Sequence, residues 1–317
     1  MTMLVSIVVP CYNSEHTIGE LVDLTIKEFE KMPQYTVEFV LVNDYSKDNT
    51  IGTIRKLCEK YPFVKGINLA RNFGQHNAIM AGLHYAEGEL IVGMDDDMQT
   101  PPSQLPIMLG KAAEGYDLVY GLYPVRKNSF LKNLSSKFNA VTSRILLGRP
   151  KEIVSSNYWV INRLVRDEVI RYKNFNPYVD AIFYRVTNNI ANVPIEHYKR
   201  EVGSSNYTFR KLVKLWLAYF NFSVVPLRIS SCLGIIFSCT GFVGALATLI
   251  RQIIAPSEQL GWASIMCAML LFFGFVLLVL GIIGEYLGKI ILSINNTPQY
   301  IIREAYNVSK VGDREEP

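Results

Sequence analysis

Three adjacent carboxylates, Asp95-Asp96-Asp97, are the strongest candidates for chemistry in this sequence. They follow an apolar run at residues 89–94 and precede Pro101-Pro102, where a helix is expected to begin. A strand that ends in acidic residues places oxygen ligands at the carboxyl edge of a sheet, where α/β sheets bind their ligands. Clustered carboxylates repel one another, so they need a cation or water beside them. By spacing alone, a cation site and a solvated acidic loop are equally good interpretations.

Tyr12 and Asp44 follow two other predicted strands, at residues 4–9 and 37–42. Their side chains are therefore expected at the same edge of the sheet as the acidic cluster. An aromatic face that stacks on a base and a carboxylate that accepts from a base N–H suit a pyrimidine pocket. The alternatives are core packing for Tyr12 and a turn role for Asp44, since Asp in a turn bonds its own backbone.

The elements that must position these residues alternate between strands and helices. Strands are predicted at residues 4–9, 37–42, 64–69, 89–94, 117–121, 153–161 and 190–195, and helices at 14–32, 48–60, 75–86, after Pro101 and over 126–149. Such alternation predicts an α/β fold with a mostly parallel sheet and helices on both of its faces. A GxGxxG motif follows none of these strands, which disfavours dinucleotide binding.

Two uncharged runs, at residues 229–250 and 260–284, predict a transmembrane hairpin. Each run exceeds the roughly 20 residues that cross a ~30 Å hydrocarbon core. We predict spans at 229–251 and 260–285, the alternative being a buried helical pair in a soluble core. Basic residues flank the hairpin and predict that both chain ends are cytoplasmic. They are Arg210, Lys211, Lys214, Arg228, Lys289 and Arg303, against Arg251 in the connecting loop.

The chain is predicted to have four parts. Residues 1–206 form a cytoplasmic domain that carries the candidate site, and residues 207–228 form an amphipathic segment suited to the membrane interface. The hairpin occupies residues 229–290, and residues 291–317 form a cytoplasmic tail that is loosely ordered after Ile302. The first residues lead directly into a strand, so no signal peptide is expected.

Composition excludes other classes. The chain of 317 residues is 50% hydrophobic and 19% charged, with a net charge of +4. This mild, scattered positive charge does not predict nucleic-acid binding. The five cysteines show no CxxC spacing, so they are expected to be reduced packing residues.

Four motifs, in this order, resemble family 2 glycosyltransferases of the GT-A fold. They are Pro10-Cys11-Tyr12-Asn13, Val42-Asn43-Asp44-Tyr45-Ser46-Lys47-Asp48, Arg71-Asn72-Phe73-Gly74 and Asp95-Asp96-Asp97-Met98-Gln99-Thr100-Pro101-Pro102. Within that family, the chain is similar to polyprenyl-phosphate glycosyltransferases. Three later segments resemble the two-span bacterial branch: Arg200-Glu201-Val202-Gly203-Ser204-Ser205-Asn206-Tyr207, Pro226-Leu227-Arg228 and Gly284-Glu285-Tyr286-Leu287-Gly288.

The resemblance implies a donor side built around a metal. A divalent cation, Mg²⁺ or Mn²⁺, would neutralise the donor diphosphate and help it to leave. The implied metal ligands are Asp95, Asp97 and Gln99. The implied nucleotide-sugar contacts are Pro10, Tyr12, Asn13, Glu15, Asp44, Arg71, Asp95 and Asp96. Asp96 fills a variable position of the motif, so a solvated acid is its alternative role. Ser14 replaces the family's Glu and is expected to cap the following helix.

The acceptor side implied by the resemblance needs cations. A phosphomonoester has a second pKa of about 6, so a lipid phosphate is already a nucleophile at neutral pH and needs no dedicated base. The implied phosphate contacts are Arg126, Lys132, Ser136 and Arg200, and the catalytic residues are Asp97 and Arg200. The chain departs from the family at Tyr123, Asn206 and the Asn157-Tyr158-Trp159-Val160 segment. These departures are compatible with a different sugar or a shifted acceptor geometry.

The sequence thus predicts an inverting, multi-pass enzyme of the bacterial inner membrane. It would move a UDP-linked hexose or amino sugar to undecaprenyl phosphate for modification of cell-envelope glycans. Gly281, Gly284 and Gly288 would allow helices to approach closely and support a homo-oligomer. One alternative is a processive polysaccharide synthase, although none of Trp159, Trp216 and Trp262 follows an Arg as its usual motif requires. The other is a catalytically inactive, membrane-anchored sensor or scaffold.

Overall fold

The computed structural model describes residues 2–123, 142–196, 262–295 and 297–308, together with single residues between 227 and 254. The chain divides into two units. Unit 1 comprises Met1–Thr208 and Asn296–Pro317, and unit 2 comprises Phe209–Asn295. The second unit is therefore inserted between two parts of the first. The predicted boundaries at 206, 228 and 290 stay predictions.

Unit 1 is built on an eight-stranded sheet in the order β7-β5-β6-β4-β1-β2-β3-β8. The strands are β1 (Met3–Cys11), β2 (Tyr35–Asn43), β3 (Val64–Leu69), β4 (Leu90–Gly93), β5 (Leu118–Leu122), β6 (Trp159–Asn162), β7 (Ile190–Pro194) and β8 (Ile302–Tyr306). The pairs β1–β2, β1–β4, β2–β3 and β5–β7 are parallel, whereas β3–β8, β4–β6 and β5–β6 are antiparallel. The predicted mostly parallel α/β sheet is confirmed.

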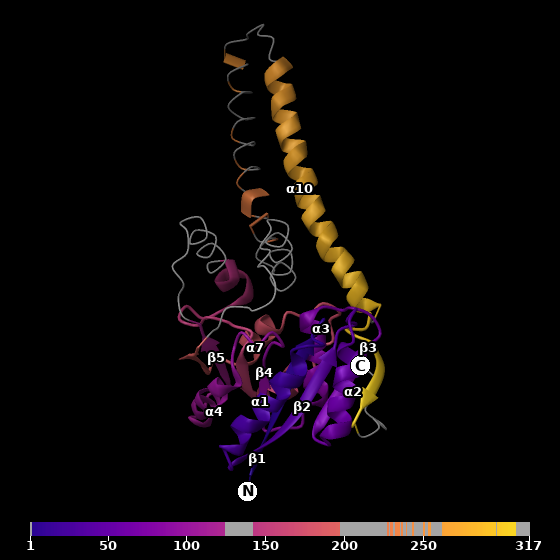
Figure 1. The fold of residues 1–317 in the computed structure, drawn as a ribbon. Coiled ribbons are helices and arrows are strands. Elements are labelled where there is room, and N and C mark those ends of the chain that lie inside the picture. Colours follow the sequence, from indigo (N-terminus) through magenta and orange to yellow (C-terminus); the bar gives the residue numbers. More distant parts are fainter. Residues whose placement is uncertain are drawn as a thin grey trace. The chain divides into compact units, whose positions relative to one another are not determined.

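Helices cover both faces of this sheet (Figure 1). They are α1 (Ile18–Glu30), α2 (Thr50–Lys60), α3 (Gln75–Tyr85), α4 (Leu105–Ala113), α6 (Arg163–Val169) and α7 (Val179–Val186), with a short 3₁₀ turn η1 (Pro102–Gln104) before α4. Alternation along β1 shows how the faces are separated. Ile7 and Val9 belong to the core with α1, α2 and α4, whereas Val8 lies against Gly82 of α3.

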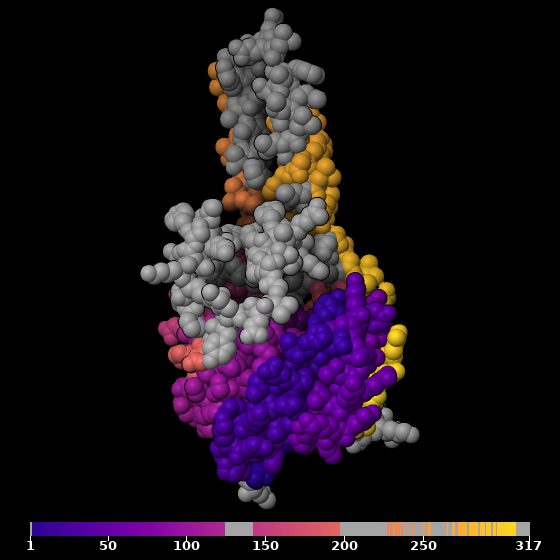
Figure 2. Space-filling view, viewed as in Figure 1, coloured from indigo at the N-terminus to yellow at the C-terminus, as the bar shows by residue number. Residues whose placement is uncertain are grey.

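The last strand corrects a prediction. Residues after Ile302 were expected to be loosely ordered because they are polar, but β8 pairs with β3 at the edge of the sheet. Its residues alternate between half-buried and exposed, as an edge strand requires. In the space-filling view this yellow segment runs along the flank of the violet residues (Figure 2).

Other elements differ from prediction around β5, β6 and β7, at the end of the sheet opposite β8. Only Trp159–Asn162 of the predicted strand at 153–161 is a strand, because this short segment alone pairs with β4 and β5. Helices α6 and α7 were not predicted. Most of the predicted helix at 126–149 lies outside the described residues, and its last part is helical at 142–147.

Unit 2 contains the long helix α10 (Trp262–Ile294). Its 21 residues Phe272–Leu292 are apolar and long enough to cross a membrane, and they are the one such stretch in the described part of the chain. The helix runs further than the predicted end at 285. The amphipathic segment at 207–228 and the first span at 229–251 lie almost entirely outside the described residues, so the hairpin stays a prediction.

Candidate active site

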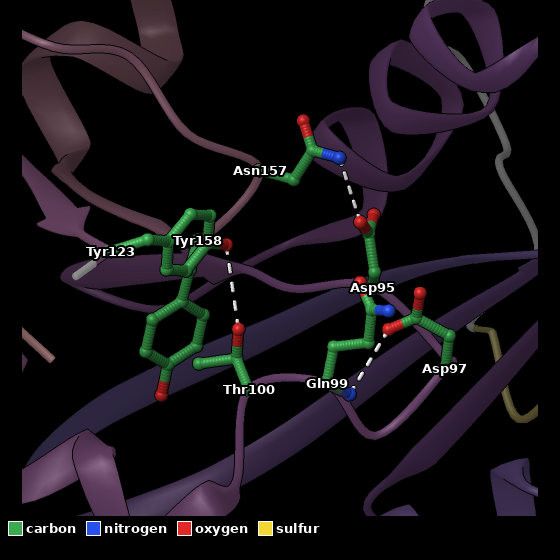
Figure 3. Close-up of a pocket in the computed structure, with 7 residues that line it drawn as sticks. All are labelled: Asp95, Asp97, Gln99, Thr100, Tyr123, Asn157 and Tyr158. Atoms are coloured by element: carbon green, nitrogen blue, oxygen red, sulfur yellow. Dashed lines mark hydrogen bonds between the residues drawn. The ribbon is translucent and has the colours of Figure 1, made fainter. Parts of the chain in front are cut away.

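A pocket of about 180 Å³ opens beside the acidic cluster. It lies at the carboxyl edge of the sheet, between the loop after β4, the end of β5 and the loop before β6 (Figure 3). The residues that line it are Asp95, Asp97, Gln99, Thr100, Tyr123, Asn157 and Tyr158. All three predicted metal ligands are therefore brought together in one cavity.

Packing behind β4 fixes the strand that carries this cluster. Gly93, the last residue of β4, lies opposite Trp159 of β6 in the sheet register. The indole of Trp159 lies so close that a β-carbon at position 93 would come within 2.1 Å of it. Only glycine fits here, and the close contact sets where Asp95 emerges from the sheet.

Two side-chain amides hold the carboxylate of Asp95. Gln75 Nε2 donates to one oxygen at 2.8 Å, and Asn157 Nδ2 donates to the other at 2.7 Å. Nearby, the backbone N–H of Gln99 donates to Asp97 Oδ1 at 3.1 Å, which keeps these two predicted ligands in one tight turn (Figure 3). Gln75 and Asn157 were not predicted as site residues. The Asn157 departure from the family pattern was the only signal that pointed to either of them.

Asp96 points to a different neighbour. Its Oδ2 accepts from the backbone N–H of Tyr12 at 3.1 Å and from the hydroxyl of Ser14. Burial raises the pKa of Asp96, and these two donors oppose the rise. Asp96 is therefore not a freely solvated acid: it joins the loop after β4 to the loop after β1. Its predicted contact with the nucleotide stays a prediction.

The helix-capping role expected for Ser14 is wrong. The N-cap of α1 is Thr17, and no side chain caps that helix. The buried Ser14 instead gives its hydroxyl to a carboxylate 82 residues further along the chain. A local pattern cannot reveal such a contact.

Asp44 is also tied to a neighbouring loop. Its two carboxylate oxygens accept from the backbone N–H groups of Phe73 and Gly74, at 2.7 and 2.8 Å. Gly74 has φ of 91°, a conformation that suits glycine. Burial raises the pKa of Asp44, while the two N–H groups oppose this rise. Asp44 therefore bonds the backbone after β3 and not that of its own turn.

Three non-glycine residues at this edge have left-handed backbone. Asn13, Tyr45 and Met98 each have φ of 57°, and they follow β1, β2 and β4. Such a conformation costs roughly 1–2 kcal/mol for a residue with a side chain. Strain of this kind collects at functional sites, where surrounding contacts hold it in place. The three loops around the candidate site therefore share one kind of sharp turn.

The other predicted nucleotide contacts occupy the same edge. Tyr12 is 47% exposed, so the core-packing alternative is wrong for it. Asn13 Oδ1 accepts from the backbone N–H of Lys47 at 2.9 Å. Pro10 lies within β1, and the exposed Arg71 lies over the ring of Phe73 at 4.7 Å.

Glu15, a further predicted nucleotide contact, is engaged elsewhere. It accepts from the backbone N–H of Asn49 at the start of α2, at 3.1 Å. This bond supports the N-terminus of α2, and the predicted contact of Glu15 with the nucleotide stays a prediction.

The pocket fits a hard divalent cation that is coordinated partly by protein oxygens and partly by oxygens of the substrate. Asp95, Asp97 and the amide oxygen of Gln99 are all oxygen donors, which Mg²⁺ and Mn²⁺ prefer. Among the residues described here, no group of three His, Cys, Asp or Glu side chains could hold a metal alone. Two carboxylates and an amide leave coordination positions for water and diphosphate oxygens, as magnesium sites with nucleotides require.

The predicted acceptor residues Arg126, Lys132, Ser136 and Arg200 lie outside the described residues. Of the predicted site residues, the structure therefore describes only those predicted for the donor side. Tyr123, noted in the sequence as a departure, lines the pocket, and its hydroxyl accepts from Thr100 at 3.4 Å. Burial raises the pKa of Tyr123, so it is a neutral phenol at pH 7.

Sequence comparison places the chain among glycosyltransferases. The family model "Glycosyl transferase family 2" matches residues 6–172. A Bacillus subtilis (strain 168) protein named uncharacterized glycosyltransferase YkcC is 36% identical over 308 residues, covering 96% of this chain and 94% of the relative. Undecaprenyl-phosphate 4-deoxy-4-formamido-L-arabinose transferase from Proteus mirabilis (strain HI4320) is 29% identical over 317 residues, covering 98% and 97%.

Solved structures share the fold. Mannosyl-3-phosphoglycerate synthase from Rubrobacter xylanophilus aligns with a TM-score of 0.51 at 18% identity, covering 72% of this chain and 75% of that one. Glucosyl-3-phosphoglycerate synthase from Mycobacterium tuberculosis, in complex with phosphoglyceric acid, aligns with a TM-score of 0.50 at 19% identity, covering 70% and 80%. At this identity the likeness concerns the fold alone, which is the GT-A-like α/β arrangement predicted from the motifs.

Proposed function

The chain belongs to glycosyl transferase family 2, and we propose that it transfers a sugar from a nucleotide donor to undecaprenyl phosphate. The observation that carries this proposal is the acidic pocket, in which Asp95, Asp97 and Gln99 meet at the carboxyl edge of the sheet. The acceptor is supported by the nearly full-length similarity to a relative named as an undecaprenyl-phosphate sugar transferase.

On the donor side, Asp95, Asp97 and Gln99 would hold Mg²⁺ or Mn²⁺. The cation would supply Lewis-acid stabilisation of the departing nucleoside diphosphate. Tyr12 offers an exposed aromatic face beside the cluster, and Asn13, Asp44 and Arg71 surround the same edge. We assign these residues, with Pro10, Glu15 and Asp96, to the nucleotide sugar, and we expect UDP as the nucleotide.

On the acceptor side, a lipid phosphate carries its own nucleophilic oxygen. Attack of that oxygen on the anomeric carbon breaks the bond to the diphosphate in one displacement, so the sugar inverts. Arg126, Lys132, Ser136 and Arg200 would bring the two anions together, and Arg200 is our candidate for the cation at the reacting phosphate.

The membrane would supply the lipid acceptor. The 21 apolar residues of α10 support an anchor, and we propose that residues 229–251 form a second span with both chain ends in the cytoplasm. The amphipathic segment at 207–228 would then lie at the bilayer surface of the bacterial inner membrane. The glycines at 281, 284 and 288 lie three and four residues apart on α10 and would allow close helix approach in an oligomer.

The test is release of nucleoside diphosphate by the purified full-length protein. Each of a panel of UDP- and GDP-linked sugars is supplied with Mg²⁺ or Mn²⁺, with and without undecaprenyl phosphate. We expect release from one donor class only when both lipid and metal are present. Lipid-independent hydrolysis, or no release across the panel, would contradict the proposal, and binding without release would favour the sensor alternative.

A further inference from the structure

A ladder of polar side chains crosses the sheet from its last strand to the loops of the proposed donor site. Asn43, Asn68 and Glu304 lie side by side on β2, β3 and β8 in the sheet register. Asn43 Nδ2 donates to Asn68 Oδ1 at 2.8 Å, and Asn68 Nδ2 donates to Glu304 Oε2 at 3.5 Å. Three strands that are far apart in the sequence are thus joined by side chains as well as by backbone.

The ladder continues into the loops that follow β2 and β1. The hydroxyl and the backbone N–H of Ser46 both donate to Asn43 Oδ1, at 2.6 and 3.2 Å. The backbone N–H of Asn13 donates to Ser46 Oγ at 3.0 Å. One unbroken path therefore leads from Glu304 to the left-handed turns that carry Tyr12 and Tyr45.

The carboxylate of Glu304 gives this path its direction. A carboxylate only accepts, so Asn68 must present its amide nitrogen to Glu304 and its oxygen to Asn43. Asn43 must then present its own nitrogen to Asn68 and its oxygen to Ser46. The Ser46 hydroxyl consequently points its hydrogen at Asn43 and leaves its oxygen to accept from Asn13. Every donor in the ladder faces the last strand.

Other contacts keep Glu304 suited to this role. Arg55 Nη2 donates to the same Oε2 at 2.8 Å, and the Tyr306 hydroxyl also donates to it. These bonds hold the pKa of Glu304 below its usual value, so it is ionised at neutral pH. The neighbouring residue Arg303 lies over the ring of Tyr45, with 5.7 Å from its Cζ to the ring centroid.

We propose that β8 is a positioning element of the donor site, in which Glu304 orients the ladder and thereby holds the loops after β2 and β1 in their nucleotide-binding form. This inference rests on the proposed function, because it takes Tyr12, Asn13 and Asp44 as donor contacts. Arg303 and Glu304 serve as positioning residues, since they act through Tyr45 and Asn68.

Three variants of the full-length protein distinguish two roles for Glu304: orienting the hydrogen bonds of the ladder, and simply stabilising β8. Glu304→Leu removes the acceptor, whereas Glu304→Gln keeps an oxygen that can accept from Asn68, Arg55 and Tyr306. Arg55→Leu removes the same Arg55–Glu304 pair but leaves the ladder intact. If Glu304 only stabilised β8, Arg55→Leu and Glu304→Leu would behave alike.

Hydrogen exchange of the loop amides gives the readout that does not depend on turnover. In Glu304→Leu we expect exchange at residues 13 and 44–47 to rise about fivefold, as loss of one hydrogen bond allows. Glu304→Gln and Arg55→Leu should stay within about twofold of the natural protein. Unchanged exchange in Glu304→Leu, or an equal rise in Arg55→Leu, would overturn the inference.

Kinetic measurements then test whether the ladder affects binding of the nucleotide sugar. Glu304→Leu should raise the KM for the nucleotide sugar about fivefold and leave kcat within about twofold, and Glu304→Gln should restore KM. A fall in kcat at unchanged KM would also overturn the inference. If the natural protein turns over no donor, the proposed function fails, while the exchange experiment still decides whether Glu304 holds the loops.

Discussion

The two ends of the sheet hold carboxylates by different kinds of donor. At the amino edge, the ammonium group of Lys65 lies 2.8 Å from Glu38, and both side chains are largely buried. The hydroxyl of Ser6 and the backbone N–H of Glu87 also donate to Glu38. The charge of this carboxylate is thus matched inside the fold by a cation of the same chain.

At the carboxyl edge, the donors named above for three carboxylates of the candidate site are neutral. Asp95 accepts from two amides, Asp96 from a hydroxyl and a backbone N–H, and Asp44 from two backbone N–H groups. Neutral donors orient a carboxylate without cancelling its charge. The comparison teaches that the carboxylate joining strands at the amino edge is matched by a cation, whereas the contacts named for the carboxylates of the candidate site come from neutral donors.

The largest effect is expected from Asp97→Asn, which removes charge at the carboxyl edge and preserves shape. The amide oxygen can still accept from the Gln99 N–H, so folding should be unaffected. We expect kcat/KM to fall at least about a thousandfold, or roughly 4 kcal/mol, through loss of metal-assisted departure of the diphosphate. The measurement is lipid-dependent release of nucleoside diphosphate, with thermal unfolding as the control. Full turnover in this variant would remove Asp97 from the metal site.

Glu38→Gln makes the opposite change at the amino edge. It removes the 2.8 Å partner of the buried Lys65 ammonium and leaves it the exposed carboxylate of Glu87 at 3.3 Å, so we expect the free energy of unfolding to fall by about 1–3 kcal/mol. The kcat of the folded fraction should not change. Adding Lys65→Met should recover part of the lost stability, which a double-mutant cycle measured by denaturant unfolding would show. An equal loss in the single and double variants would contradict the pairing.

Asp180 tests whether a buried carboxylate that accepts from a neutral hydroxyl destabilises the folded protein when it is ionised. It accepts from the Tyr120 hydroxyl at 2.6 Å, and burial raises its pKa from 3.8 to about 6, an effect that Arg149 only partly opposes. The folded state therefore binds this proton more tightly than the unfolded state does, and stability from this group falls as pH rises from 4 to 6.

Asp180→Asn removes that titration and keeps an oxygen for Tyr120. Relative to the natural protein, the variant should gain roughly 2 kcal/mol of stability between pH 4 and pH 7. Unfolding of both proteins at a series of pH values provides the measurement. A stability difference that is the same at pH 4 and pH 7 would show that Asp180 does not titrate in this range.

The smallest effect is expected from Ser14→Ala at the carboxyl edge. The buried Asp96 loses one donor, so the free energy of unfolding should fall by about 1 kcal/mol. Loss of this donor also raises the pKa of Asp96 further, because the Ser14 hydroxyl favours the charged form. The exposed Ser103 provides a matched control, and Ser103→Ala should leave stability unchanged. Equal effects of the two substitutions would contradict the bridging role of Ser14.

Local sequence patterns were enough to predict the central strands and the edge of the sheet that carries the candidate site. The predicted strand at 64–69 coincides with β3, where the apolar residues Val64, Ile67 and Leu69 are buried. The positions of Tyr12, Asp44 and Asp95 followed from the same logic, since parallel strands end at one edge. The family motifs added the roles that spacing alone left undecided.

Long-range partners could not be predicted in the same way. Gln75 and Asn157 lie 20 and 62 residues from Asp95, and no local pattern joins them. The alternation in β8 was visible as Ile302, Glu304 and Tyr306 on one side, but three polar residues among five concealed it. Edge strands tolerate polar side chains because one flank faces water, so polarity argued wrongly against a strand.

The place of β8 in the chain has a consequence for synthesis. Gly66 pairs with Tyr306, so the outer flank of β3 receives its partner only after the whole of unit 2 has been made. Until then a row of backbone N–H and C=O groups on β3 stays open to pairing with another chain. Completion of the sheet is therefore delayed until the apolar helix has left the ribosome, and a nascent chain that stalls before residue 302 carries an unprotected edge.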